Sequence, residues 1–351
     1  MLFLSFVVSI NVTAQVPQYY SNALGLNGQP LRVALYNIIK SHQSLGYSGL
    51  WNAYLLTDKK SNGKVWDIYS DRPGGISAYE YSFGTDQCGS YNAEGDCYNR
   101  EHTFPQSYFN KNEPMRSDLF IVYPTDGYVN GKRSDFPYGK VTSPTYTSSN
   151  GSKLGPNNAT GAPSGTAFEP IDSFKGDLAR SYFYLATRYY SEDNGWSNWE
   201  MANGAELKAW AIAMLLNWHH ADPVSQKEMM RNNAAYGLQQ NRNPFIDYPQ
   251  FADCIWGTAD CKALAIPDMK AHIALSLFPN PAKDKVTIDW SYDASSDPAT
   301  LQLINLQGQI FYSTTTANKS ITIATEQFPR GMYIIRIESS KEQRRGKLYL
   351  Q

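Results

Sequence analysis

The sequence predicts an α+β fold in which a mainly helical first domain is followed by a small β-sandwich. Amphipathic helical periodicity recurs between about Pro17 and Lys270, and short alternating apolar segments replace it after Ala274. The chain has 351 residues, a length that suggests about two domains. We therefore expect the first domain over residues 15–273 and the second over residues 274–351.

Three segments carry the helical prediction. Apolar residues of segment 172–190 fall within an arc of about 80° on a helical wheel, which indicates one apolar face. Segment 206–218 is rich in Ala, Leu and Met, and segment 225–239 begins with the Ser-x-x-Glu spacing of a capping box. Segment 142–166 is rich in Ser, Thr, Gly, Asn and Pro, so we expect a loop or an insertion there.

The C-terminal part alternates apolar and polar residues in short runs, separated by turn residues such as Gly308 and Gly331. Strands at a spacing of roughly 10 residues are typical of an immunoglobulin-like β-sandwich. Residues 278–281, Phe-Pro-Asn-Pro, predict a turn before the first strand. The expected strands are 286–290, 301–305, 309–313, 321–324, 332–337 and 347–350.

The composition excludes several classes of protein. Lys and Arg number 31 against 32 Asp and Glu, a formal net charge of −1, and 42% of the residues are apolar. These values argue against a disordered chain, a collagen-like fibre and a polybasic tail that binds nucleic acid through bulk charge. Residues 275–351 hold 9 basic and 7 acidic residues, which leaves 22 and 25 for the rest, a charge of about −3. An anionic substrate must therefore be held by a local site.

The first 14 residues predict a signal peptide. An apolar run at 2–10 is followed by Thr13 and Ala14, a small-residue pair suited to cleavage, although a positive segment before the run is missing. The run is shorter than the roughly 20 apolar residues that span a bilayer, so we expect no membrane span. The alternative is a buried N-terminal strand.

The four cysteines are expected to form disulfides in an exported protein. Four cysteines allow three connectivities, and the two local pairs, Cys88 with Cys97 and Cys254 with Cys261, are the simplest. Neither pair has the C-x-x-C spacing of a zinc or thioredoxin-like site. Unpaired thiols are the alternative.

The candidate catalytic residues gather around His102. Glu101 directly precedes it, and residues 117–124 follow as a buried-strand pattern that we expect Pro124 to stop. Residues 125–127 can open a short helix that carries Asn130 and Arg133 on one face.

This pattern fits phosphodiester hydrolysis. A histidine with a pKa near neutrality can deprotonate water, and oxygen ligands from Glu101 and Asn130 suit Mg²⁺. Arg116 or Arg133 can bind a phosphate through paired hydrogen bonds. The alternative is that Glu101 and His102 form a surface turn and that Asn130 is a solvated helix residue.

The sequence resembles the bacterial endonuclease I family of secreted, sugar-nonspecific nucleases, which have a ββα-metal (His-Me finger) site. The resemblance covers about residues 31–257 and is carried by several motifs. They are 67–70 (DIYS), 88–91 (CGSY), 94–102 (EGDCYNREH), 123–130 (YPTDGYVN), 133–134 (RS), 168–170 (FEP), 179–180 (AR), 218–219 (WH), 222–225 (DPVS), 231–232 (RN) and 241–247 (NRNPFID).

The resemblance implies a mainly helical nuclease domain built around the ββα-metal motif. In it, His102 is the general base, while Glu101 and Asn130 bind one Mg²⁺, for which Mn²⁺ or Ca²⁺ can substitute. Arg133 and Arg116 are both candidates to hold the phosphate. The implied substrate is DNA, with RNA left open, and the products carry a 5′-phosphate. The chain departs from the family pattern at 120–121 and at Asp135, which puts metal preference and rate in doubt rather than activity.

The C-terminal part resembles the type IX (Por) secretion sorting domain. The matching residues are 277–282 (LFPNPA), Gly308, 331–337 (GMYIIRI) and 347–348 (KL). The resemblance implies export through the type IX machinery to the cell surface or the medium. An immunoglobulin-like carbohydrate-binding or adhesion module is the alternative.

Three further predictions concern a histidine pair, the oligomeric state and an alternative function. His219 and His220 end a helix, where contacts at the helix terminus are favoured over a shared metal because adjacent helical residues point about 100° apart. We expect a monomer. A non-enzymatic surface protein that binds nucleic acid on a nuclease-like scaffold is the alternative function.

Overall fold

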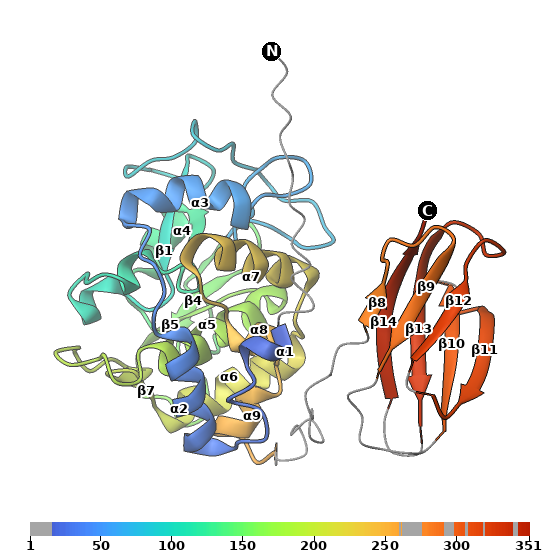
Figure 1. The fold of residues 1–351 in the computed structure, drawn as a ribbon. Coiled ribbons are helices and arrows are strands. Elements are labelled where there is room, and N and C mark those ends of the chain that lie inside the picture. Colours follow the sequence, from blue (N-terminus) through green and yellow to red (C-terminus); the bar gives the residue numbers. More distant parts are fainter. Residues whose placement is uncertain are drawn as a thin grey trace. The chain divides into compact units, whose positions relative to one another are not determined.

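The fold is described from a computed structural model (Figure 1). It describes residues 16–259, 261, 276–290, 298–305, 308–318, 320–339 and 343–351. The chain divides into two compact units, Met1–Ala265 and Ile266–Gln351. The expected signal peptide at 1–14 and the expected boundary near Ala274 lie outside the described residues.

The first unit is a mixed α+β structure of helices and small antiparallel sheets. Its helices are α1 (Val16–Tyr19), α2 (Gly28–Ile39), α3 (Leu50–Thr57), α4 (Gly127–Arg133), α5 (Lys175–Arg188), α6 (Ala209–Ala221), α7 (Gln226–Gln239), α8 (Pro244–Asp247) and α9 (Phe251–Trp256). Its strands are β1 (Tyr98–His102), β2 (Val122–Asp126), β3 (Tyr146–Thr147), β4 (Lys153–Pro156), β5 (Thr166–Glu169), β6 (Ala202–Asn203) and β7 (Glu206–Leu207).

Helix α5 forms the centre of this unit (Figure 1). The helix is confirmed, and because every residue from Gly176 to Arg188 is buried, its polar side lies inside the protein as well as its apolar face. Its polar residues are accommodated by partners: Arg180 donates to Glu228 on α7, and Arg188 donates to Glu192. Helices α2, α6 and α8 pack around α5.

The other helical predictions hold with one shift. Ser225 and Glu228 make the expected capping box, because the Ser225 hydroxyl accepts from the Glu228 amide and the Glu228 carboxylate accepts from the Ser225 amide. The helix expected at 206–218 begins only at Ala209, since Glu206 and Leu207 pair in the short strand β7.

Segment 142–166 is not simply a loop. It contributes β3 and β4, and β4 pairs with β5 in a three-stranded antiparallel sheet. The polar composition of the segment gives no strand signal, because β4 forms by pairing with β5. In that pairing Lys153 is opposite Glu169 and Leu154 is opposite Phe168.

Pro124 does not stop strand β2. It lies inside the strand, opposite Arg100 of β1, and the strand continues to Asp126. The sheet has two strands, so β2 has a ladder partner on one side only. Proline has no amide hydrogen to donate, and it is tolerated at such an edge because no neighbouring strand needs that donor.

The second unit is all-β. Its strands are β8 (Ser276–Phe278), β9 (Lys285–Asp289), β10 (Ala299–Asn305), β11 (Ile310–Thr316), β12 (Ser320–Ala324), β13 (Gly331–Glu338) and β14 (Gln343–Leu350). They form one sheet in the order β11-β10-β13-β14 and another in the order β12-β9-β8. One apolar core, which includes Ile288, Leu301 and Ile335, draws on both sheets. The six expected strands are confirmed, and β8 adds one that ends at Phe278, where a turn was expected.

The disulfide prediction agrees with the structure. Cys88 pairs with Cys97 and Cys254 pairs with Cys261, so all four cysteines are bonded. Among the residues described here, no helix has the length and hydropathy required to cross a membrane.

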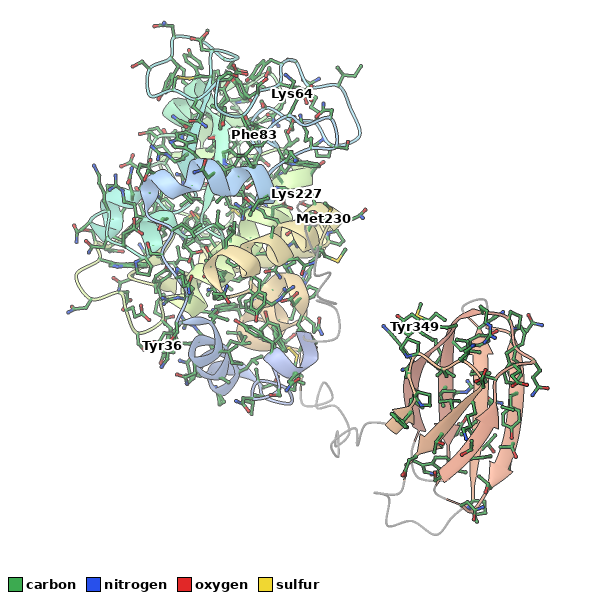
Figure 2. The ribbon with its side chains drawn as sticks, turned by 45° about the horizontal axis from the view of Figure 1, so that its top comes forward. Tyr36, Lys64, Phe83, Lys227, Met230 and Tyr349 are labelled. Carbon is green, nitrogen blue, oxygen red and sulfur yellow. A yellow bond between two sulfur atoms is a disulfide. The ribbon has the colours of Figure 1, made fainter. Side chains whose placement is uncertain are left out.

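A buried charge network joins α3, α7 and the segment before β2. Arg231 Nε donates to Asp58 Oδ1 (2.9 Å), and its other nitrogens donate to the carbonyl oxygens of Leu119 and Val122. Lys227 Nζ lies 3.9 Å from the same Asp58 oxygen. Figure 2 labels Lys227 and Met230 on this helix, and Met230 is 62% exposed. The network therefore links helices α3 and α7 to the start of strand β2.

Replacing Arg231 should destabilise the protein strongly. In Arg231→Met, Asp58 loses its main partner while its side chain stays buried, which is expected to lower the free energy of unfolding by about 3–5 kcal/mol. Chemical denaturation measures this difference. Asp172→Ala, which breaks a pair whose carboxylate is 96% exposed, is the matched control and should change stability by less than about 1 kcal/mol. Equal effects of the two substitutions would contradict the network's role.

Candidate active site

A strand–strand–helix unit builds the candidate site. Strands β1 and β2 are antiparallel, with Glu101 opposite Tyr123 and His102 opposite Val122. Helix α4 follows β2 directly, because the Asp126 carboxylate caps it by accepting from the Val129 amide. The unit brings β1 and α4 side by side (Figure 1).

One cavity of about 430 Å³ lies against this unit. Its lining includes Glu101, His102, Asn130 and Arg133, so four of the five expected site residues meet there. Arg116, the fifth, is not part of the lining, although its backbone contacts His102.

Glu101 is a buried carboxylate with defined partners. It is 2% exposed, and its Oε1 accepts from the Tyr69 hydroxyl (2.8 Å) and from Arg133 Nη1 (3.0 Å). Burial raises the pKa of Glu101 to about 7, and the neighbouring Arg133 opposes that rise. A cation at this carboxylate would favour its ionised form for the same electrostatic reason.

His102 is held as a neutral imidazole in one tautomer. Its Nε2 lies 3.0 Å from the Arg116 carbonyl oxygen, and because a carbonyl only accepts, Nε2 carries the proton and Nδ1 has the lone pair. Burial, together with the positive charges of Arg116, Arg100 and Arg133, lowers the pKa of His102 to about 4, against the raising effect of the backbone hydrogen bond. At neutral pH the ring is therefore uncharged, with a pKa below the near-neutral value that the sequence predicted for a general base.

Asn130 presents an oxygen. Its Nδ2 donates to Asn99 Oδ1 over 2.6 Å, so the amide nitrogen is engaged and the amide oxygen is the atom that can ligate a cation. Asn99 stands two residues before Glu101 on β1, which ties the orientation of this amide to the strand that carries the carboxylate.

The two expected phosphate-binding arginines differ in their surroundings. Arg133 is 1% exposed, and its nitrogens contact Glu101 and donate to the carbonyl oxygens of His102 (2.9 Å) and Thr103 (2.6 Å). These contacts hold the guanidinium inside the protein, although Arg133 also lines the cavity. Arg116 is half-buried, with its guanidinium carbon 4.3 Å from the centroid of the Tyr47 ring.

Sequence reasoning missed several residues of the cavity wall, among them Arg100 and Tyr47. Arg100 lines the cavity and lies inside the matched motif, so its position next to Glu101 could have indicated it. Tyr47 also lines the cavity, but it is more than 50 residues away and carries no local signal.

The residues present fit a single divalent cation. Mg²⁺ prefers oxygen ligands and keeps several waters, so a carboxylate and an amide oxygen in a cavity of this volume suffice. Over the described part of the chain, no group of three or more His, Cys, Asp or Glu side chains is arranged to hold a metal. A cation at Glu101 and Asn130 would thus depend on few protein ligands.

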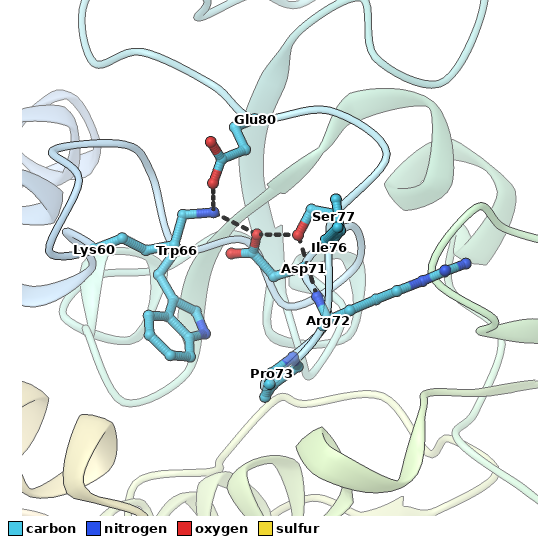
Figure 3. A pocket seen from close by; sticks show the side chains of 10 residues that line it. Lys60, Trp66, Asp71, Arg72, Pro73, Ile76, Ser77 and Glu80 are labelled. Carbon is cyan, nitrogen blue, oxygen red and sulfur yellow. Dashed lines mark hydrogen bonds and ion pairs between the residues drawn. The ribbon is translucent and has the colours of Figure 1, made fainter.

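A second cavity, of about 370 Å³, is less suited to catalysis (Figure 3). Its charged groups pair with one another: Lys60 Nζ lies 2.5 Å from Asp71 Oδ1 and 2.6 Å from Glu80 Oε1, and Ser77 Oγ donates to Asp71. These pairs anchor the loop that carries Ser77 and Glu80.

The two adjacent histidines have separate partners, in agreement with the predicted helix-end role. His219 is buried, and its Nε2 lies 2.9 Å from the Pro249 carbonyl oxygen while its Nδ1 lies 3.3 Å from Arg180 Nη1. His220 is exposed and contacts Asp253. They share no ligand geometry.

Comparisons with known proteins agree with this geometry. Residues 27–250 match the family described as Endonuclease I, and residues 276–351 match a secretion system C-terminal sorting domain. An extracellular ribonuclease of Bacillus amyloliquefaciens is 33% identical over 256 residues, which are 70% of this chain and 81% of the ribonuclease. An extracellular ribonuclease of Bacillus subtilis is 33% identical over 254 residues, 69% of this chain and 80% of that protein. Endonuclease-1 of Buchnera aphidicola subsp. Baizongia pistaciae is 26% identical over 137 residues, 38% of this chain and 47% of its own.

The sorting domain marks the protein for type IX export, to the cell surface or the medium. The first match spans more than half of the chain and contains the whole strand–strand–helix unit with Glu101, His102 and Asn130. The chain therefore belongs to the Endonuclease I family and is a nuclease.

Proposed function

We propose that the protein hydrolyses phosphodiester bonds of DNA and RNA in the 430 Å³ cavity, with little sequence preference and with one bound Mg²⁺. The observation that carries the proposal is the buried, neutral His102, held in one tautomer beside Glu101 and Asn130. The strand–strand–helix order of the unit that presents them supports the ββα-metal arrangement that the family resemblance implies.

In the proposed reaction His102 is the general base. Its Nδ1 takes a proton from a water molecule whose oxygen forms a bond to phosphorus. The bond from phosphorus to the 3′ oxygen breaks, and that oxygen takes a proton from solvent. The products are a 5′-phosphate and a 3′-hydroxyl. The Nε2 contact with the Arg116 carbonyl holds the ring while Nδ1 gains its proton, and the resulting imidazolium returns it to solvent.

Glu101 and Asn130 are proposed to hold the cation, which when bound supplies positive charge that stabilises the charge developing on the phosphate and the leaving oxygen. We assign the phosphate contact to Arg116, because Arg133 is engaged within the protein. Arg133 is instead proposed to position Glu101.

Two kinds of relative support a broad substrate range. The relatives include an extracellular ribonuclease and an endonuclease-1, so both RNA and DNA are proposed as substrates. A site that grips one phosphate with a cation and an arginine contacts features shared by both polymers.

The C-terminal unit is proposed to be an immunoglobulin-like β-sandwich that the type IX machinery recognises. Its two antiparallel sheets and common core support this assignment.

Removing the general base should nearly abolish cleavage. His102→Ala is expected to lower kcat about 10²- to 10⁴-fold on plasmid DNA with Mg²⁺, since the water then lacks a proton acceptor. The matched control is His220→Ala, which alters an exposed histidine paired with Asp253 and should cleave as the wild type does. Full activity of the His102→Ala protein would refute the mechanism, and a wild type inactive with every divalent cation would favour a binding protein.

Loss of an oxygen ligand should weaken the response to metal. EDTA is expected to stop cleavage, and Asn130→Ala should raise the Mg²⁺ concentration for half-maximal activity by about tenfold or more, since it removes one of two proposed protein ligands. A Mg²⁺ titration of cleavage rate measures this shift. An unchanged titration curve in Asn130→Ala would exclude Asn130 as a ligand.

Deleting residues 275–351 should block export without harming the nuclease. The two units have separate cores, so the truncated protein is expected to retain cleavage activity while it accumulates in the periplasm. Cell fractionation with a nuclease assay on each fraction measures both properties. Unchanged export of the truncated protein would argue against the sorting role.

A further inference from the structure

We propose that Tyr47 is a positioning residue that holds two guanidinium groups, Arg100 and Arg116, beside His102 to bind the phosphate backbone of the substrate. Tyr47 begins a 3-10 turn (Tyr47–Gly49) that leads into α3, far in sequence from the strand–strand–helix unit. The inference rests on the proposed nuclease function and adds a second phosphate-binding arginine, Arg100, to it.

The Tyr47 ring gathers three functional side chains. The guanidinium carbons of Arg100 and Arg116 lie 3.5 Å and 4.3 Å from its centroid. The His102 ring is stacked with it, at 5.7 Å between centroids and 29° between planes. Each arginine thus meets the electron-rich face of an aromatic ring, an arrangement that favours a cation.

Arg100 is held on several sides but still faces the cavity. It also lies 4.3 Å from the Trp51 ring, and its Nη1 donates to the Tyr47 carbonyl oxygen over 2.8 Å. Arg100 lines the same cavity as Glu101 and His102. An arginine fixed between two rings loses little further rotamer freedom when it binds a phosphate, so binding costs less entropy.

The segment that carries Tyr47 is tied to the segment that carries Arg116. Ser44 Oγ donates to Glu113 Oε2 over 2.9 Å and lies 2.9 Å from Ser117 Oγ. The Arg116 carbonyl oxygen also accepts a hydrogen bond from His102 Nε2. One local structure therefore fixes the positions of Arg116, His102 and Tyr47 relative to one another.

The guanidinium groups of Arg100 and Arg116 are suited to binding a polyanion. Two guanidinium groups close to one cavity suit the phosphates of a nucleic-acid strand, which arginine binds through paired hydrogen bonds. Near-neutral overall charge gives the chain little bulk attraction for such a strand, so the affinity must come from a few well-placed cations.

The test is binding of fluorescein-labelled 12-nucleotide single-stranded DNA, measured by fluorescence anisotropy in EDTA at several salt concentrations, with the full chain. Tyr47→Leu is expected to raise Kd roughly 5- to 30-fold and to flatten the salt dependence of binding. Tyr47→Phe should bind as the wild type does, because the ring face and not the hydroxyl makes these contacts. In cleavage assays with Mg²⁺, Tyr47→Leu should raise KM more than it lowers kcat.

The matched control is Tyr190→Leu, which removes another ring from an arginine, Arg32, at 4.6 Å, outside the lining of the cavity. It should leave Kd and its salt dependence unchanged. Tyr47→Leu combined with Arg100→Gln should raise Kd by less than the product of the two single effects, since Tyr47 acts in part through Arg100.

Wild-type Kd and salt dependence in Tyr47→Leu, or an equal loss in Tyr190→Leu, would overturn the inference while leaving the nuclease proposal intact. If Tyr47→Leu does not fold, as judged by circular dichroism, Arg100→Lys and Arg116→Lys carry the test, because lysine keeps the charge and loses the flat stacking group. Unchanged binding in both would then overturn it. Failure of the wild type to cleave concerns only the proposed function, since the binding assay contains no metal.

Discussion

The buried ion pair between Arg133 and Glu101 holds together the strand and the helix that form the candidate active site. It joins the last residue of α4 to the fourth residue of β1, and the same guanidinium donates to the carbonyl oxygens where β1 ends. Two ions removed from water are costly unless their hydrogen bonds are made. The Tyr69 hydroxyl and the two carbonyls make them here, so the pair holds strand and helix in one register.

The same burial that demands the ion pair also sets the chemistry. Glu101 and His102 are neighbours in the chain, yet burial moves their pKa values in opposite senses, toward about 7 for the acid and about 4 for the base. Low polarity disfavours the charged form of each. A carboxylate whose ionised form a bound cation would favour therefore lies next to an imidazole that is uncharged at neutral pH.

Short-range patterns were the most reliable guides to the fold. The capping box at Ser225, the helix around Leu178 and the alternating strands near Ile335 are properties of a few neighbouring residues, and each appears as expected. The errors concern pairing and burial. Pro124 sits inside an edge strand, and segment 142–166 gains strands because β5 is available beside it, neither of which local composition can show.

The sequence by itself determined the two-part α+β organisation and the membership of a nuclease family. It also predicted the two local disulfide pairs as the simplest of three connectivities, and it pointed to His102, Glu101 and Asn130 as candidate site residues. These follow from periodicity, cysteine spacing and motifs within about 30 residues. Only the tertiary structure gives the arginines their different surroundings. Arg133 is buried against Glu101, and Tyr47 arrives from a distant turn to hold Arg100 and Arg116. The physical reason is that burial and long-range contact depend on the path of the whole chain, which no local pattern records.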